Sequence, residues 1–139
     1  MTSYTILYNR CLAKIEDPTL TMLAEEDLMN MLHGYLMSAI AKHRTCEHDL
    51  SDRDDELMQF NSDLSDIELE IVGILMAREW VSQQLLSVTN TLQVFSGKET
   101  NYYSQAAHLK ELQALDEKLR LEAQQLSRDY SYAHSEYFD

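Results

Sequence analysis

The most apolar segment of the chain is SDIELEIVGILMAREWV, residues 65–81. Ser65 precedes the first apolar residue, and Asp66 and Glu68 fall in the first turn, where acids favour the positive end of a helix. Apolar residues then recur at the three- and four-residue spacing of a helix. The pattern predicts a central helix over 65–81, buried through Ile67, Ile71, Ile74, Leu75 and Trp80.

Four more segments are predicted to be helical, over about Tyr4–Ile15, Ala24–Arg44, Gln84–Phe95 and Ser104–Tyr130. The first, second and last of these segments have apolar residues on one face at helical spacing. The last is the longest, and its stripe steps by threes and fours, which favours core packing over a coiled coil. Its members are Leu109, Leu112, Leu115, Leu119, Ala123, Leu126 and Tyr130.

These segments predict an all-α fold: a compact bundle of about four to five helices with a long C-terminal helix. The 139 residues contain 3 Gly and 1 Pro, too few for the frequent turns of a β-sandwich or barrel. We expect a single helical domain over 1–130 and a short extended tail over 131–139. A turn is predicted over Ser96–Asn101, and residues 45–65 lose the helical period.

The charge excludes several function classes. There are 24 acidic and 11 basic residues, a net charge of -13. Nucleic-acid binding and attachment to an anionic membrane need clustered Lys and Arg, so neither is expected. No apolar run approaches the ~20 residues that span a bilayer. Cys11 and Cys46 make no disulfide framework, and Met1–Tyr4 begins no signal peptide, which favours a reducing cytoplasm.

No catalytic, cofactor or metal site is predicted. His43, Cys46 and His48 lie close together, but their spacing matches no common zinc module. Residues 52–63 lack the glycine and final glutamate of a calcium loop. No histidine follows a glutamate by three residues, as a di-iron bundle requires, and no nucleophile elbow is present. An enzyme is therefore not expected.

Aromatic residues that lie outside the helical stripes, or at their very end, are candidate partner-binding residues. Tyrosine rings bring large contact area at low entropic cost and are frequent anchors at protein interfaces. The alternative is that these rings close the core of this one domain. The candidates are Tyr102, Tyr103, Tyr130, Tyr132, Tyr137 and Phe138.

Several strings resemble small structural proteins of tailed bacteriophages, specifically the head–tail connector, or neck adaptor, proteins. The resemblance covers about residues 22–138. The strings are LSDRDDE (50–56), LSDIELEI (64–71), EW (79–80), VFSGKE (94–99), YYSQAAHL (102–109) and RDYSY (128–132).

The resemblance implies a mainly helical protomer, made in the bacterial cytoplasm, that forms a ring in the virion neck. Such rings are commonly twelvefold and contact the portal protein and a tail or second neck protein. They carry no catalytic residues. Many dock through an extended C-terminal arm, and the matching stretch here, Ser131–Asp139, is short.

The acids of the first half of the chain fit such a channel, through which the genome passes without sequence-specific binding. Six acids lie between Glu47 and Glu56, with only Arg53 among them. An acidic wall repels phosphates, so we expect Asp52, Asp54, Asp55 and Glu56 to be candidate channel-facing residues. The alternatives are a solvated acidic surface, and, for the whole chain, a soluble acidic helical module that binds or regulates another protein.

Overall fold

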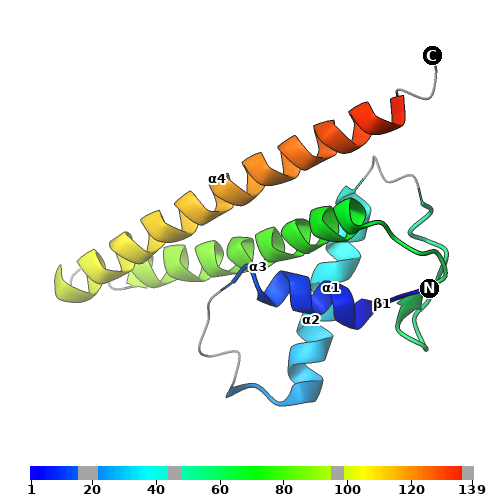
Figure 1. The fold of residues 1–139 in the computed structure, drawn as a ribbon. Coiled ribbons are helices and arrows are strands. Elements are labelled where there is room, and N and C mark those ends of the chain that lie inside the picture. Colours follow the sequence, from blue (N-terminus) through cyan, green and yellow to red (C-terminus); the bar gives the residue numbers. More distant parts are fainter. Residues whose placement is uncertain (16–21, 44–47, 95–98, 136–139) are drawn as a thin grey trace.

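Two long helices lie side by side and dominate the computed structural model (Figure 1). The structure describes residues 1–15, 22–43, 48–94 and 99–135; of these, the side chains of 89–105 and 133–135 are not described. The long helices are α3 (Asp66–Val94) and α4 (Glu99–Ser135). Two shorter helices, α1 (Tyr4–Leu12) and α2 (Glu25–Lys42), pack against α3. The predicted helical bundle with a long C-terminal helix is confirmed.

Helix α3 is the centre of the core, as the apolar pattern predicted. Val72, Met76 and Ala77 have no solvent exposure, and Ile71 and Ile74 are almost fully buried. The helix continues to Val94, so the prediction of a separate helix over 84–95 was wrong. No Gly or Pro lies between the two predicted segments, so the helical backbone hydrogen bonds continue from the first segment into the second.

Helix α4 is longer than predicted at both ends. It begins at Glu99, inside the predicted turn, and ends at Ser135. Residues 131–135 are therefore helical and do not form the extended tail that the sequence suggested, while 136–139 lie outside the described residues. Leu112, Leu119, Ala123 and Tyr130 are the buried members of its stripe. Among the helices, α4 packs mainly on α3, with few contacts to α1 or α2.

Helix α1 begins at the predicted residue and α2 begins one residue after it. The Ser3 hydroxyl accepts a hydrogen bond from the Thr5 amide at 3.3 Å, which caps α1. Helix α2 begins with three acids, Glu25, Glu26 and Asp27, next to the positive end of its dipole. Both helices end two or three residues before the predicted positions, a normal error for helix ends.

The segment predicted to be irregular contains a small hairpin. Strands β2 (Arg53–Asp54) and β3 (Gln59–Phe60) pair antiparallel, and β3 also pairs with β1 (Thr2–Ser3), giving the order β1-β3-β2. The Thr2 hydroxyl donates to the carbonyl of Ser62 at 2.9 Å and accepts from the Leu64 amide at 3.0 Å. The hairpin is thus attached to both the N-terminus and the approach to α3.

Aromatic rings join the hairpin to the helices. The Phe60 ring packs edge-on to that of Tyr4, with centroids 5.0 Å apart, and Tyr4 also lies near Tyr8 and His33. Close aromatic pairs of this kind stabilise a fold beyond the area that they bury. The sheet is small, but its buried ring makes it part of the main core.

Candidate functional site

The acidic hairpin uses three of its four candidate carboxylates to hold its own shape. Asp52 Oδ1 accepts from the side-chain amide of Asn61 at 2.8 Å. Asp54 Oδ1 accepts from the amides of Glu56 and Leu57, both at 3.0 Å, and this fixes the turn. Asp55 Oδ1 accepts from the Tyr4 hydroxyl at 2.6 Å. That these residues face a DNA channel stays a prediction.

The Asp55–Tyr4 contact changes the proton affinity of both groups. The hydrogen bond from Tyr4 holds the pKa of the Asp55 carboxyl below its ordinary value. Burial, reinforced by the Asp55 carboxylate, raises the pKa of Tyr4 strongly. The tyrosine therefore stays protonated and the aspartate ionised, so the pair serves to hold the hairpin on α1.

The structure describes the side chains of two of the six candidate aromatic residues. Tyr132 is exposed, at 72% of its maximum, whereas Tyr130 is only 2% exposed. The prediction that Tyr130 is a partner-binding residue was therefore wrong: it is the last member of the buried α4 stripe. The backbones of Tyr102 and Tyr103 lie in α4, but their side chains, and all of Tyr137 and Phe138, lie outside what the structure describes.

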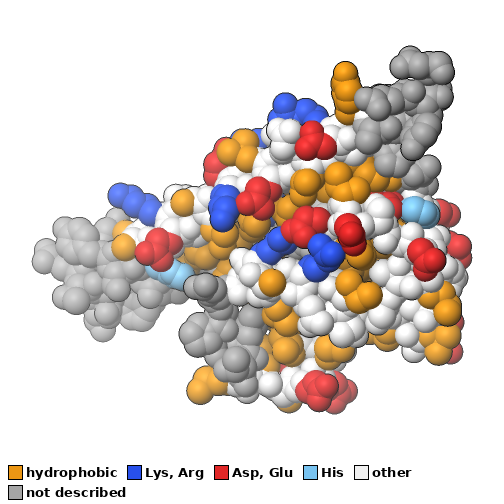
Figure 2. Space-filling model, in the orientation of Figure 1, with side chains coloured by type: hydrophobic (Ala, Val, Ile, Leu, Met, Phe, Trp, Pro, Cys, Tyr) orange, Lys and Arg blue, Asp and Glu red, His pale blue; other side chains and the backbone are white. Residues whose placement is uncertain are grey.

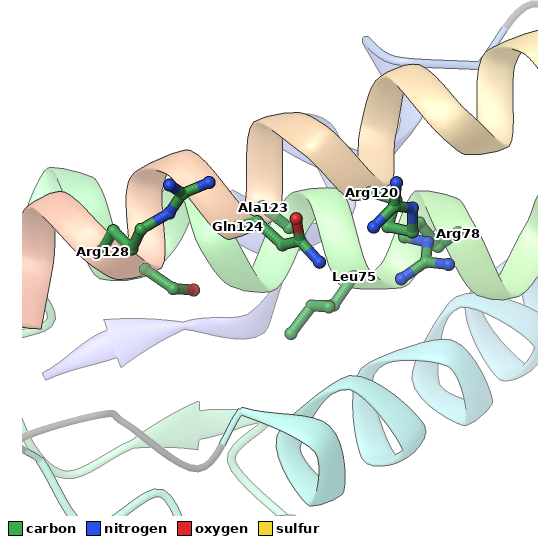
Figure 3. A pocket seen from close by; sticks show the side chains of 7 residues that line it. Leu75, Arg78, Arg120, Ala123, Gln124 and Arg128 are labelled. Atoms are coloured by element: carbon green, nitrogen blue, oxygen red, sulfur yellow. The ribbon is translucent and has the colours of Figure 1, made fainter.

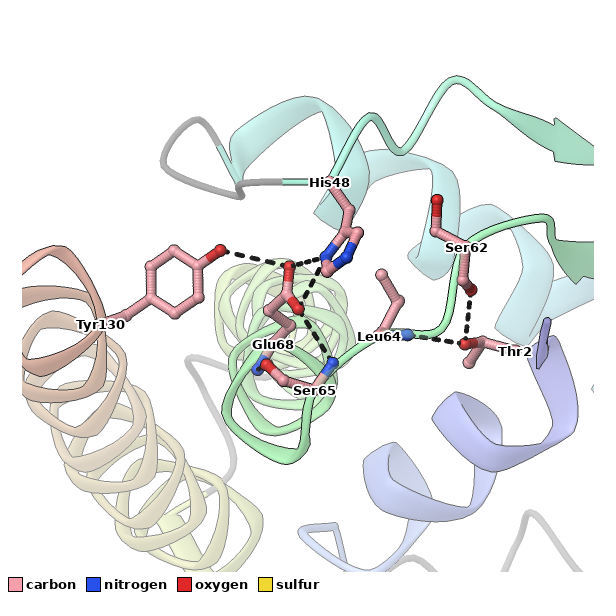
Figure 4. Close-up of polar contacts among 7 residues, drawn as sticks. All are labelled: Thr2, His48, Ser62, Leu64, Ser65, Glu68 and Tyr130. Carbon is pink, nitrogen blue, oxygen red and sulfur yellow. Dashed lines mark hydrogen bonds and ion pairs between the residues drawn. The ribbon is translucent and has the colours of Figure 1, made fainter. Parts of the chain in front are cut away.

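A buried polar cluster surrounds Glu68, which is 1% exposed (Figure 4). Its Oε1 accepts from the Ser65 amide at 2.9 Å, and the Ser65 hydroxyl accepts from the Glu68 amide at 3.3 Å, which together form a capping box. His48 Nδ1 lies 2.8 Å from Glu68 Oε2, and the Tyr130 hydroxyl donates to the same oxygen at 3.3 Å. One carboxylate thus connects the start of α3, the chain after α2 and the end of α4.

His43 lies next to this cluster. It is buried, and its ring meets that of Tyr130 edge-on, with centroids 6.4 Å apart. Burial lowers its pKa, and the Glu68 carboxylate opposes that shift. Cys46 lies outside the described residues. Within the described part of the chain, no three His, Cys, Asp or Glu side chains converge on a metal position.

Cys11 is a core residue. It is completely buried, and burial raises the pKa of its thiol to about 12. A thiol with so high a pKa supplies almost no thiolate at neutral pH and is chemically inert. This agrees with its position on the apolar stripe of α1.

A basic groove runs between α3 and α4, and the sequence did not reveal it. It has a volume of about 410 Å³. Figure 3 shows Arg128 at one end and Arg78 and Arg120 at the other, with Leu75 and Ala123 between them. Its lining includes no acidic residue. The only available signal was the spacing of Arg120, Gln124 and Arg128, which four-residue steps bring toward one face of a helix.

Two of the groove arginines have acidic neighbours beyond its edge. Arg78 Nε lies 3.1 Å from Oδ1 of Asp116, and Arg120 Nε lies 3.0 Å from Oε2 of Glu117. The Glu117 pair is exposed and contributes little to stability. Among the described residues, Arg128 has no ion pair. The groove therefore has an apolar floor and an available guanidinium group.

A second cavity, of about 320 Å³, lies where the end of α1 meets α3 and α4. Lys14, His108 and Glu111 line it together with Trp80 and Leu112. The ammonium of Lys14 is already paired with Glu70. The side chains that line this cavity do not include a Ser, Thr or Cys nucleophile.

None of the helices in the described part of the chain has the length and apolarity to cross a membrane. Comparison of the chain with protein-family models, curated proteins and solved structures finds no match. The structure therefore presents three features for functional interpretation: an acidic hairpin, a basic α3–α4 groove and a buried Glu68 cluster.

Proposed function

We propose that this chain is a structural subunit that self-assembles into the adaptor ring of a tailed-phage neck, between the portal and the tail. The resemblance of its sequence strings to neck adaptor proteins supports the assignment. The proposal gives the chain no catalytic step. It acts by binding its own copies and the neighbouring neck proteins, and by leaving a channel for the genome.

The structural observation that carries this proposal is the exposure of the α3–α4 pair. Because α4 packs mainly on α3, its outer face is open to solvent. Large apolar side chains stand on this pair, including Leu86 on α3 and Leu121 and Tyr132 on α4. Figure 2 shows hydrophobic side chains reaching the surface where α4 meets the body of the protein. Contiguous exposed apolar patches mark protein–protein interaction sites, and we propose that these side chains belong to one that neighbouring subunits cover.

The acidic end of the molecule fits the channel of such a ring. Acidic side chains gather at the edge of the protein formed by the hairpin and the nearby loops (Figure 2). Carboxylates there would repel DNA phosphates over roughly 10 Å at moderate ionic strength. We propose that Asp52, Asp54 and Asp55 face the channel, in addition to their hydrogen bonds within the hairpin.

The proposal is tested by measuring assembly and location. We expect sedimentation velocity at rising protein concentration to detect oligomers, alone or with the portal protein, and electron microscopy to show them as rings. Antibody labelling should place the chain at the neck of purified virions. A chain that stays monomeric with and without portal, and that is absent from virions, would contradict the proposal.

The second candidate function is an acidic helical module that binds or regulates one other protein. The exposed carboxylates of the hairpin favour it, since they present a ready surface to a basic partner. Such a module would stay monomeric at all concentrations and form a complex of fixed stoichiometry with its partner. The same sedimentation experiment therefore separates the two candidates.

A further inference from the structure

We infer that copies of this chain bind head to tail, with the hairpin tip of one copy, Glu56-Leu57, docked in the basic α3–α4 groove of the next. Glu56 pairs with Arg128, and Leu57 lies on the apolar floor of the groove. This inference rests on the proposed self-assembly and names the contact that produces it. It assigns Glu56 to the subunit interface rather than to the channel.

The tip has the form of a rigid projecting anchor. Leu57 is 67% exposed although it is a large apolar residue. The Asp54 carboxylate holds the amides of Glu56 and Leu57, and Met58 has a positive φ of 55°. The Met58 carbonyl accepts from the Tyr4 amide at 2.9 Å, which ties the turn to α1. A preorganised tip loses little conformational entropy when it binds.

The groove offers the complementary chemistry. Leu75 and Ala123 supply an apolar floor for one aliphatic side chain, and arginines stand at both ends. Arg78 and Arg120 are paired with acids outside the lining, so, among the described residues, Arg128 supplies the unpaired positive charge of the groove. Arginine also binds carboxylates through two parallel hydrogen bonds, which gives geometric specificity.

The two charged groups proposed to meet are both available. Glu56 is exposed, and in the described part of the chain its carboxylate accepts no side-chain hydrogen bond and has no ion pair. Arg128 is likewise exposed and without an ion pair among those residues. By contrast, Asp54 and Asp55 are occupied within the hairpin, and Arg78 and Arg120 have their own acids. Pairing Glu56 with Arg128 therefore breaks no bond within either copy.

The two surfaces lie on different parts of the chain, and this determines which type of oligomer the contact produces. The tip belongs to the β2–β3 hairpin and the groove to the α3–α4 pair, so each copy presents two different surfaces. Such a heterologous contact leaves one free surface of each kind on every dimer. Repetition then gives a closed ring or an open filament, not a symmetric dimer.

The test is a charge exchange between two variants. Glu56→Arg places a cation opposite Arg128, and Arg128→Glu places an anion opposite Glu56. The self-association constant of each variant alone should be at least about tenfold lower than that of the unaltered chain. Mixing the two variants should restore association, because every contact between unlike variants again joins opposite charges. Sedimentation velocity measures all three samples.

Matched controls carry the same charge changes elsewhere. Glu26→Arg on α2 and Lys110→Glu on α4 alter exposed side chains far from the groove lining in sequence, and should leave association close to that of the unaltered chain. Leu57→Ser should weaken association without changing charge. Circular dichroism establishes that each variant is folded.

The outcomes separate this contact from the proposed function. If the unaltered chain associates but the two exchange variants and their mixture associate equally well, this contact is wrong and self-assembly stands. If the mixture fails to recover while each variant is folded, the pairing of Glu56 with Arg128 is wrong. If the unaltered chain does not associate, alone or with the portal, the proposed function itself fails.

Discussion

His48 Nδ1 lies within 2.9 Å of both carboxylate oxygens of Glu68, although Glu68 is almost completely buried. The histidine belongs to the chain after α2, and the glutamate lies in the first turn of α3. Their contact fixes the approach to the central helix, and the Tyr130 hydroxyl joins α4 to the same carboxylate. The polar cluster therefore stabilises the arrangement that holds the hairpin and the groove in position.

Replacing Glu68 tests this cluster. Glu68→Ala removes the capping box and leaves the groups around the carboxylate without their acceptor, so we expect the free energy of unfolding to fall by about 3 kcal/mol. Glu68→Gln keeps an oxygen for the Ser65 amide and should cost about half as much. Urea unfolding measures both. Glu111→Gln, at an exposed position on α4, is the control and should change stability by less than about 0.5 kcal/mol.

Acidification should destabilise the protein through His43. Burial lowers its pKa below the ordinary 6.5, so the unfolded chain takes up this proton at a higher pH than the folded chain. Above about pH 6.5 His43 is neutral in both states and the free energy of unfolding keeps its full value. As the pH falls below about 6.5, the free energy of unfolding decreases by at most about 1.4 kcal/mol per pH unit.

Urea unfolding from about pH 7.5 to about pH 5 measures this loss. His43→Gln removes the buried imidazole and should give a flatter dependence, while the other histidines are common to both proteins. The lowered pKa of Asp55 and of Glu70 affects stability only at lower pH, near ordinary carboxyl values. Equal slopes for the two proteins would show that His43 does not cause the loss.

Tyr130 and Tyr132 should respond oppositely to the same substitution. Tyr130→Ala removes a buried ring and its hydrogen bond to Glu68, so stability should fall by about 3 kcal/mol or more. Tyr132→Ala removes an exposed ring and should cost less than about 1 kcal/mol. Thermal unfolding followed by circular dichroism measures the difference. A large loss of stability in Tyr132→Ala would instead show that the Tyr132 ring is part of the core.

Two glycines give a test of helix packing. A Cβ at Gly34 would meet nothing within 4 Å, so Gly34→Ala should stabilise α2 by about 0.5–1 kcal/mol. A Cβ at Gly73 would lie 3.0 Å from the Cβ of Arg10, close to the backbone of α1. Because α1 must then move away from α3, Gly73→Ala should lower stability by about 1 kcal/mol despite its better helix propensity. Urea unfolding should find opposite signs for the two variants.

Local patterns predicted α1, α2 and most of α4, but they divided α3 into two separate helices. The cap at Ser3, the acids that begin α2 and the apolar period of α3 act between residues a few positions apart, so they can be recognised without the fold. The ends of α4 were missed because its stripe of buried residues is shorter than the helix itself. Residues 99–135 remain helical beyond that stripe, since no helix-breaking residue interrupts the backbone.

The candidate site was less predictable, because its parts lie far apart in the sequence. The sequence alone determined the helical class, the central helix and the acidity of the segment before it. Only the tertiary structure paired residues 2–3 with 59–60, buried Tyr130 against Glu68 and placed Arg78 beside Arg120. Periodicity reports which face of an element is apolar, but it carries no information on which distant charges that face brings together.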